Sequence, residues 1–210
     1  MAGSPVDWLT AHRELLAAQP RGPALDVACG LGRHAMMLAG MGFIVDALDV
    51  SDTALEAVDA QARRRGRAIH TKRVDLRTDD WRPERAYQIV VDTYFLERSL
   101  FGRLADALAP GGLLFFETFM EGQPELNPSY MVAPGELRSA FAQLDVLDAR
   151  EGRVDSDRVL ASLVARKPLR EDVAGKRSLP ARGIVRSPGA SQVLRCAICV
   201  SPLRRLFPTA

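Results

Sequence analysis

Short apolar segments alternate with amphipathic segments along most of the chain. The apolar segments cover residues 24–28, 43–50, 68–76, 87–95 and 113–119, and each has the length and composition of a strand. Segments with helical spacing follow the first, second and fourth of them, at residues 32–39, 51–65 and 97–109. Strands this apolar are buried on both faces, so the alternation predicts a parallel sheet that helices cover on both sides.

The two ends of this region depart from the alternation. Residues 4–18 have the pattern of one helix, with Ser4 as its N-cap, Pro5 in its first turn and Asp7 completing a capping box. After a loop and a further helix at 134–144, two strands at 145–153 and 158–167 follow each other directly. We therefore expect these two strands to form an antiparallel hairpin at one edge of the sheet.

Charge and composition divide the chain at residue 168. Residues 1–168 carry 20 basic and 24 acidic residues, whereas residues 169–210 carry eight basic and two acidic ones. The later segment lacks hydrophobic periodicity and is rich in Pro, Gly, Ser and Arg, which is typical of disorder. The prediction is one domain over 1–168 and a basic, disordered tail over 169–210. Because no basic stripe runs through the acidic domain, a nucleic acid partner is disfavoured.

The three cysteines, Cys29, Cys196 and Cys199, do not indicate a metal site. A structural zinc ion needs about four ligands, and the three histidines are scattered along the chain. The sequence has no apolar run of about 20 residues, the length that a membrane-spanning helix needs. Its N-terminus also lacks the basic and apolar regions of a signal peptide. We therefore expect no metal, no membrane span and a cytoplasmic location.

The stretch ALDVACGLGRHA at residues 24–35 joins the first strand to the first helix of the alternation through Gly30 and Gly32. A glycine turn at this place brings backbone N–H groups and a helix N-terminus close to a ligand. The spacing Gly30-x-Gly32-x-x-Ala35 matches the loop that binds NAD or FAD. Asp26 argues against a dinucleotide, because a carboxylate there repels an anionic pyrophosphate and attracts a cationic ligand.

Two further carboxylates stand at strand ends. Asp49 ends the second strand, where its carboxylate can accept hydrogen bonds from both hydroxyls of a ribose in a dinucleotide or in another nucleoside. Asp75 ends the third strand, where it can accept from the amino group of an adenine that lies across strands one to three. These positions predict a nucleoside site at the carboxyl ends of the strands.

Five motifs in this order carry a resemblance to a known family. They are LDVACGLGRHA (25–35), ALDVS (47–51), RVDLR (73–77), IVVDTYFLER (89–98) and LAPGGLLFFETF (108–119). Over residues 4–168 the chain resembles class I S-adenosylmethionine (SAM)-dependent methyltransferases. Within that class it resembles small bacterial enzymes of the tellurite-resistance type, through FFETFMEGQPELNPSYMVAPGEL at 115–137. The resemblance implies a Rossmann-like α/β fold, with a seven-stranded, mostly parallel sheet, helices on both faces and a C-terminal antiparallel hairpin.

The resemblance also implies SAM as cosubstrate and a role for each matched residue. Asp26, Ala28, Gly30 and Gly32 would hold the methionine end of SAM, although many members have a glycine where this chain has Ala28. The remaining positions would be Asp49 at the ribose, Val50 and Leu76 around the adenine, Asp75 at its amino group, and Asp92 and Thr93 near the amino acid part and the methyl group.

The chemistry of methyl transfer determines which catalytic groups the acceptor site needs. A sulfonium is already a strong electrophile, so the protein needs to align a nucleophile and exclude water. A thiolate or a reduced chalcogen needs no base, whereas a hydroxyl or an amine needs one. Candidate pocket residues are Tyr94, Glu97, Arg98, Glu117 and Tyr130, and the sequence assigns none of them a catalytic role. His34 is a further candidate base, but its place in the first helical turn suits the cofactor or solvent better.

The sequence therefore predicts a SAM-dependent methyltransferase that acts on a small-molecule acceptor, with soft sulfur, selenium or tellurium nucleophiles as one class. The run DTYF at 92–95 lacks the prolines of motifs that grip a flipped base, which disfavours a nucleic acid substrate. The basic tail keeps an RNA substrate open, because phosphate attraction needs only charge. The sequence also leaves open a protein-directed methyltransferase, an NAD-dependent oxidoreductase and a SAM-fold binding module without turnover.

Overall fold

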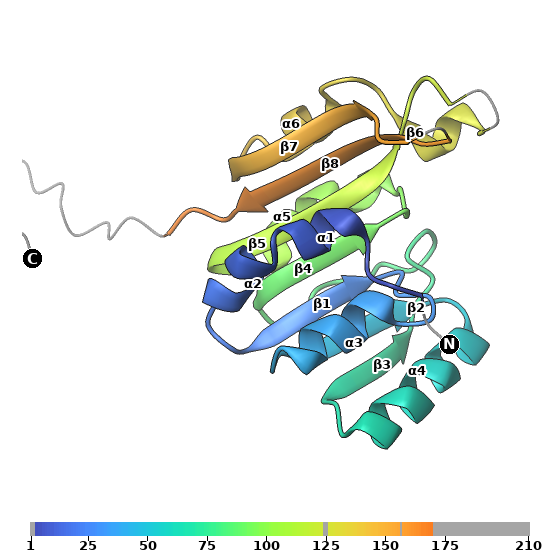
Figure 1. The fold of residues 1–210 in the computed structure, drawn as a ribbon, viewed down its shortest axis with the longest axis vertical. Coiled ribbons are helices and arrows are strands. Elements are labelled where there is room, and N and C mark those ends of the chain that lie inside the picture. The colour runs from blue at the N-terminus through green and yellow to red at the C-terminus, as the bar shows by residue number, and fades with distance from the viewer. Residues whose placement is uncertain (1–2, 124–125, 156, 170–210) are drawn as a thin grey trace, which may run out of the picture. The chain divides into compact units, whose positions relative to one another are not determined.

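One mixed sheet runs through the computed structural model, which describes residues 3–123, 126–155 and 157–169 (Figure 1). Seven strands follow the order β3-β2-β1-β4-β5-β8-β7, and the short strand β6 pairs with β5. The strands are β1 (Pro23–Val27), β2 (Ile44–Asp49), β3 (Ile69–Arg73), β4 (Tyr87–Thr93), β5 (Leu108–Met120), β6 (Met131–Val132), β7 (Asp145–Arg153) and β8 (Val159–Arg166).

The directions of the strands confirm the predicted fold class. Strands β3, β2, β1, β4 and β5 are mutually parallel, whereas β8 is antiparallel to β5 and β7 is antiparallel to β8. The C-terminal hairpin therefore lies at one edge of a Rossmann-like α/β sheet. The chain order reverses between β1 and β4, and ligands bind open parallel sheets at such a switch point.

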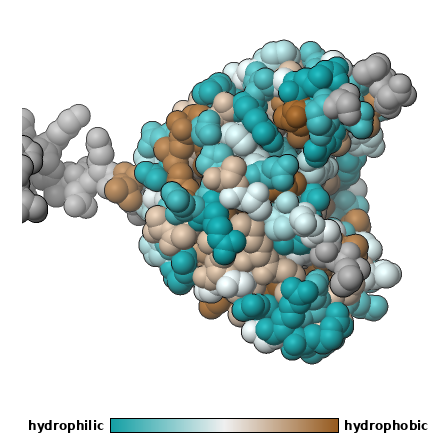
Figure 2. Space-filling view, viewed as in Figure 1, coloured by the Kyte–Doolittle hydropathy of each residue, from teal (hydrophilic) through white to brown (hydrophobic). Residues whose placement is uncertain are grey.

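Helices cover both faces of the sheet. In Figure 1, α1 (Asp7–Ala11), α2 (Arg13–Ala18), α3 (Arg33–Gly40) and α4 (Asp52–Arg65) lie on the near face. The far face carries α5 (Phe101–Ala107) and α6 (Glu136–Ala140), and two short 3-10 turns are η1 (Arg98–Leu100) and η2 (Pro128–Tyr130). Figure 2 shows hydrophilic residues gathered over α4, as expected for a helix with one face in water. None of the helices in the described ranges is long and apolar enough to cross a membrane.

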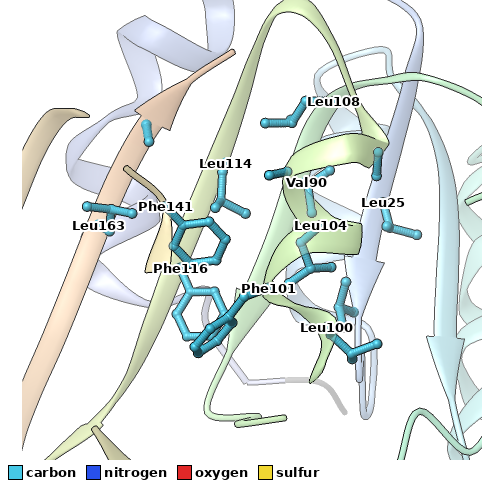
Figure 3. Close-up of a cluster of buried hydrophobic side chains, with 14 of the residues drawn as sticks. Leu25, Val90, Leu100, Phe101, Leu104, Leu108, Leu114, Phe116, Phe141 and Leu163 are labelled. Atoms are coloured by element: carbon cyan, nitrogen blue, oxygen red, sulfur yellow. The ribbon is translucent and has the colours of Figure 1, made fainter. Parts of the chain in front are cut away.

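The far side of the sheet is held by a cluster around three phenylalanines. The ring centroids of Phe101, Phe116 and Phe141 are 5.2 to 5.6 Å apart (Figure 3). Leu104 of α5 and Leu163 of β8 belong to the same cluster and are fully buried. Burial of apolar side chains is the dominant favourable contribution to folding, so this cluster fixes the strands whose ends carry the site.

The N-terminal helix differs from the prediction. It is broken at His12 into α1 and α2, and its N-cap is Val6, so Ser4 does not cap it. The imidazole of His12 bonds the carbonyl oxygen of Trp8 at 2.8 Å through Nδ1 and lies 3.0 Å from Asp148 Oδ2 through Nε2. His12 and Asp148 of β7 are far apart in the sequence, so no local pattern encodes this contact.

Three boundaries in the second half of the sheet also differ from the prediction. Strand β3 ends at Arg73, because Asp75 turns the chain by accepting the Arg77 N–H at its own Oδ1. Strand β5 begins at Leu108, before the apolar segment expected at 113–119, and its pairing with β4 shifts register near this start. A Cβ on Gly112 would lie 2.8 Å from the Tyr87 carbonyl oxygen, so this irregularity requires glycine. The helix expected over 134–144 spans only Glu136–Ala140.

The predicted basic tail lies outside the described residues, apart from Leu169. Cys196 and Cys199 lie outside them as well. Disorder over 169–210 therefore stays a prediction.

Candidate functional site

The loop between β1 and α3 adopts left-handed backbone conformations at three positions. The φ angles are +50° at Ala28, +53° at Gly30 and +74° at Gly32. Glycine is favoured in this region of backbone space, so Ala28 occupies a position where a glycine would be less strained. A Cβ on Gly32 would lie 2.7 Å from Val58 Cγ2 of α4, so this glycine also lets α3 and α4 approach closely.

Asp49 fixes the loop to the end of β2. Its Oδ2 accepts the Gly30 N–H at 2.7 Å, and its Oδ1 accepts the Ser51 N–H at 2.9 Å. The Cys29 N–H donates to the Leu48 carbonyl oxygen at 2.8 Å, one residue earlier in β2. The carboxylate is therefore oriented from two sides and faces the space beside the glycines.

Asp26 is buried beneath the loop. Its side chain is 1% exposed, and its Oδ2 accepts the Ala35 N–H of α3 at 2.8 Å. Burial raises the pKa of Asp26 to about 7, against the lowering effects of the Ala35 hydrogen bond and of Arg33. This carboxyl group therefore changes charge near neutral pH, and a cation nearby favours its ionised form.

His34 holds the N-terminal segment against the site. The Val6 N–H donates to His34 Nε2 at 3.3 Å, so the ring proton of the neutral imidazole lies on Nδ1. That nitrogen is 3.3 Å from Thr93 Oγ1 and 3.8 Å from Asp26 Oδ1. Burial, with a contribution from Arg33, lowers the pKa of His34 to about 3. The imidazole is thus a buried neutral connector rather than an accessible base.

Two cavities meet at Ala28, on either side of the glycine loop. The first, here called the loop cavity, has a volume of about 380 Å³. It is lined by Gly3, Ala28, Cys29, Gly30, Leu31, Arg33, His34, Thr93 and Tyr94. The second, here called the strand-end cavity, has a volume of about 360 Å³. It is lined by Ala28, Asp49, Val50, Val74, Asp75, Leu76, Arg77 and Phe95.

The structure brings most of the predicted adenine residues to the strand-end cavity. Val50 is 50% exposed at one side of it, whereas Leu76 is buried in the core and contributes a wall. Asp75 lines the same cavity from the turn after β3, and the hydrogen bonds that it accepts from the Arg77 N–H and the Thr78 side chain lower its pKa. A carboxylate has about four acceptor positions, so these bonds leave capacity for a ligand.

The two predicted residues at the end of β4, Asp92 and Thr93, have different surroundings. Thr93 lines the loop cavity beside His34, whereas Asp92 lines neither cavity. Alternate residues of a strand point to opposite faces, which explains the separation. Asp92 is 1% exposed, and its Oδ1 has no hydrogen-bond partner among the described residues. Burial, and then the charge of Asp26, raise the pKa of Asp92 well above its usual range.

Tyr94 stands at the rim of the loop cavity in a strained backbone conformation. Its φ is +60°, and its N–H donates to the Glu117 carbonyl oxygen at 2.7 Å. Arg158 donates to the Tyr94 hydroxyl at 3.0 Å, and the guanidinium of Arg33 lies 5.5 Å from the ring centroid. Burial and the nearby Glu117 raise the pKa of Tyr94, which keeps the hydroxyl protonated at neutral pH.

The predicted pocket residue Glu117 is engaged inside the sheet. It is 1% exposed, and its Oε2 accepts from Ser162 Oγ at 2.8 Å and from Arg150 at 3.1 Å. These three residues face one another across β5, β8 and β7 in the strand register. The guanidinium of Arg150 also lies 4.9 Å from the ring centroid of Trp8 in α1.

The other three pocket candidates line neither the loop cavity nor the strand-end cavity. Glu97 caps η1 by accepting from the Ser99 N–H and hydroxyl. Arg98 donates to Glu136 and to the Met131 carbonyl oxygen. Tyr130 lies with its ring centroid 5.4 Å from the guanidinium of Arg77, a residue that lines the strand-end cavity.

The sequence prediction missed three charged or aromatic residues that line the cavities. They are Arg33, Arg77 and Phe95. Each of them directly follows a predicted site residue in the sequence. Their position next to a strand end or the glycine loop could therefore have marked them as candidates. Their side-chain directions depend on tertiary packing, and periodicity does not encode them.

A third cavity, of about 210 Å³, lies at the edge formed by β2 and β3 and shares no lining residue with the other two. Its buried carboxylate, Asp46, accepts from the Tyr87 hydroxyl at 2.8 Å and from Arg85 at 2.9 Å. Nδ1 of His70 is 3.3 Å from the same carboxylate. Because these polar groups satisfy one another, we interpret this cluster as structural.

Comparison with known proteins is consistent with this geometry. Residues 24–112, which contain β1 to β4 and both sides of the two cavities, match a family model described as a methyltransferase domain. This part of the chain is similar to a methyltransferase domain. The match, with the fold, supports SAM as its cosubstrate and confirms the resemblance to class I methyltransferases.

Individual relatives match the methyltransferase domain at low identity. The ubiquinone biosynthesis O-methyltransferase of Burkholderia orbicola (strain MC0-3) is 28% identical over 116 residues, or 53% of this chain and 48% of that protein. The chain therefore spans about half the length of the curated relatives it matches, since 48% of the first of them is covered.

Solved structures extend the likeness to most of the sheet. TehB from Haemophilus influenzae aligns with a TM-score of 0.65 at 20% identity, over 77% of this chain and 61% of that one. A SAM-dependent methyltransferase from Methanosarcina mazei aligns with a TM-score of 0.60 at 16% identity, over 80% of this chain and 100% of that one. At these identities the likeness concerns the fold.

The buried neutral His34 makes a prediction about acid stability. Its folded-state pKa of about 3 lies below the value near 6.5 of an unfolded histidine, so the unfolded chain binds the extra proton between these pH values. Stability contributed by His34 is therefore complete above pH 6.5 and is lost as the pH falls toward 3. When the pH is lowered from 7.5 to 5, we expect the free energy of unfolding of His34→Gln to rise by about 2 kcal/mol relative to that of the unsubstituted chain.

Urea unfolding at the two pH values measures this difference. Asp26 titrates in both proteins, so its own opposite contribution largely cancels in the comparison. An equal free-energy difference between the two proteins at pH 5 and pH 7.5 would contradict the neutral, buried assignment of His34.

Proposed function

We propose that this chain is a SAM-dependent methyltransferase that acts on a small-molecule acceptor through a domain over residues 1–168. The observation that carries the proposal is the pair of cavities that meet at Ala28, one lined by Asp49 and Asp75 and the other by the glycine loop and Arg33. One cavity matches a nucleoside and the other a charged amino acid chain, and their common border is where the two parts of SAM are joined.

The chemistry of the strand-end cavity fits an adenosine. Its apolar walls include Val50 and Leu76, between which we place the adenine, with Asp75 at the amino group. We assign the ribose hydroxyls to Asp49, whose carboxylate is already oriented by Gly30 and Ser51. Hydrogen bonds that hydroxyls donate to a carboxylate are stronger than neutral ones, which gives this residue a large share of the affinity.

The loop cavity fits the methionine part of SAM. Ala28, Cys29 and Gly30 line it from the glycine loop, and we assign the methionine carboxylate to the guanidinium of Arg33. When bound, SAM supplies a methyl group on a cationic sulfur. Asp26 is buried beneath the loop and Thr93 borders the cavity, so we assign them to stabilising this positive end and to shaping its surroundings.

Two observations support a soft nucleophile as the acceptor. The candidate bases His34, Glu97 and Glu117 are each engaged in the described structure, by Val6, by Ser99 and by Arg150, respectively. Burial also holds the phenol of Tyr94 in its protonated form. A thiolate or reduced chalcogen attacks without transferring a proton to the protein, so this surrounding suits it.

A hydroxyl acceptor is the second candidate. It is favoured by the matched ubiquinone biosynthesis O-methyltransferase, whose name states transfer to oxygen. A neutral hydroxyl requires a base in the transition state, and in this chain a base would have to be released from its present partner. The two candidates therefore differ in their dependence on a protein base.

Cosubstrate binding provides the first test. At 100 times the dissociation constant, a ligand that binds only the folded chain adds about 2.7 kcal/mol of stability. We expect SAM and S-adenosylhomocysteine, but not NADH, to raise the melting temperature in a thermal-shift titration. Asp49→Ala should weaken SAM binding by about 2 kcal/mol, because the charged hydrogen bonds to the ribose are lost.

Calorimetry of the Asp49 variant separates the two assignments. Unchanged SAM affinity in Asp49→Ala would refute the ribose assignment, and stabilisation by NADH alone would refute the cosubstrate. Asp52→Ala is the matched control, because this neighbouring carboxylate is exposed on α4 and lines neither cavity.

The pKa of about 7 at Asp26 predicts a pH-dependent preference for the charged ligand. Asp26 is neutral below this pH and negative above it, while SAM differs from S-adenosylhomocysteine by the positive charge on sulfur. We expect the affinity of SAM relative to S-adenosylhomocysteine to rise between pH 6 and pH 8. Isothermal calorimetry across this range measures the ratio, and Asp26→Asn should make it independent of pH. A pH-independent ratio in the unsubstituted chain would refute the role of Asp26.

The acceptor class is tested by comparing matched nucleophiles. With excess SAM, we expect methyl transfer to a thiol and to a selenol, and slower transfer to a phenol of the same carbon skeleton. Product formation followed by mass spectrometry measures all three rates. A phenol methylated faster than its thiol analogue would favour the hydroxyl candidate instead.

A further inference from the structure

Arg77 has an unusual set of contacts for a surface arginine of this protein. Its guanidinium carbon lies 5.6 Å from the ring centroid of Phe95 and 5.4 Å from that of Tyr130. Both distances are within the range of cation–π attraction. We call Phe95, Arg77 and Tyr130 the Arg77 cluster.

Nearby arginines behave differently. Among the described residues, several arginines of this region make an ion pair with a carboxylate, whereas no carboxylate lies within ion-pair distance of Arg77. The paired ones are Arg73 with Asp52, Arg82 with Asp80, Arg98 with Glu136 and Arg103 with Asp80. The charge of Arg77 is therefore held against aromatic faces and is available to a further electron-rich group.

The Arg77 cluster borders the strand-end cavity. Arg77 and Phe95 both line it, and Val50, another lining residue, is 50% exposed, so the cavity opens to solvent. The Arg77 N–H donates to Asp75 Oδ1 at 3.0 Å, which anchors the backbone of Arg77 directly beside the carboxylate of the cavity. The backbone of Arg77 is thus fixed at the edge of a cavity whose apolar walls and carboxylate suit an adenine.

The third member of the cluster comes from a distant part of the chain. Tyr130 ends η2, and the next residue, Met131, begins β6. Arg98 donates to the Met131 carbonyl oxygen at 2.9 Å and pairs with Glu136 of α6. Arg98 therefore fixes the backbone beside Tyr130, whose ring lies near Arg77 at the strand-end cavity.

We propose that Arg77, supported by Phe95 and Tyr130, binds the adenine of the cosubstrate by stacking its guanidinium on the base. Guanidinium planes stack on nucleic acid bases, and the attraction of a cation to a π face adds to the contact. The two rings restrict the arginine before the ligand arrives, which lowers the entropy that binding costs. This assignment rests on the proposed function, because it places adenosine in the strand-end cavity.

Two ligands distinguish the adenine end of the site from the methionine end. S-adenosylhomocysteine carries both parts, whereas 5′-methylthioadenosine has the adenosine and lacks the amino acid. We expect Arg77→Ala to raise the dissociation constants of both ligands by the same factor of about ten, as measured by calorimetry. Arg33→Ala, at the methionine end, should weaken the binding of S-adenosylhomocysteine and leave the binding of 5′-methylthioadenosine unchanged.

Matched variants control for folding and for charge. Arg82→Ala removes an exposed arginine that lines neither cavity, and it should leave both dissociation constants unchanged. Tyr130→Phe keeps the ring and should bind normally, whereas Tyr130→Ala should lose part of the affinity for both ligands. Arg77→Met keeps the length of the side chain without its charge and should bind as weakly as Arg77→Ala, even if the alanine variant folds poorly.

The outcomes separate this proposal from the proposed function. If the unsubstituted chain binds neither ligand, the proposed function fails. If it binds both and Asp49→Ala weakens them, but Arg77→Ala and Arg77→Met do not, then the adenine role of Arg77 alone is overturned. Weakening of S-adenosylhomocysteine alone in the Arg77 variants would also overturn it, because it would place Arg77 at the methionine end.

Discussion

The hydrogen bond from the Gly30 N–H to Asp49 Oδ2 is the constraint on which the geometry of the site depends. It joins the left-handed turn after β1 to the last residue of β2, and the neighbouring bond from Cys29 to Leu48 reinforces it. With the turn held there, the space beside the sheet is divided into two cavities that share Ala28. The same bond aims the Asp49 carboxylate into one of them, so one interaction shapes the site and supplies part of its chemistry.

Burial of ionisable groups gives the site its electrostatic character. Asp26 and Asp92 both have raised pKa values because they are removed from water, and each also responds to other carboxyl groups. His34, between Asp26 and Thr93, stays neutral for the same reason. A buried carboxyl group such as Asp26, with a pKa of about 7, favours a cationic ligand, since a positive charge stabilises its ionised form.

The two halves of the domain contribute differently to recognition. The family match covers residues 24–112, which hold the glycine loop, Asp49, Asp75 and the end of β4. Residues 113–169 supply Glu117, Arg150 and Arg158, whose contacts surround Tyr94 and the N-terminal helices. The family match thus covers the glycine loop and the strand ends, while several contacts of Tyr94 and of the N-terminal helices come from residues outside the match.

Local pattern was sufficient for the strands, the glycine loop and the C-terminal hairpin. Hydrophobic periodicity and turn residues act over a few positions, so the sequence by itself determined the sheet and brought Asp49, Asp75 and Thr93 to its carboxyl edge. Only the tertiary structure decided which candidate side chains are free to act. Asp148 contacts His12 where the first helix breaks, and Arg150 donates a hydrogen bond to Glu117. Arg98 and Arg77 hold Tyr130 beside the strand-end cavity. These contacts join residues far apart in sequence, and their directions are set by packing rather than by any local period.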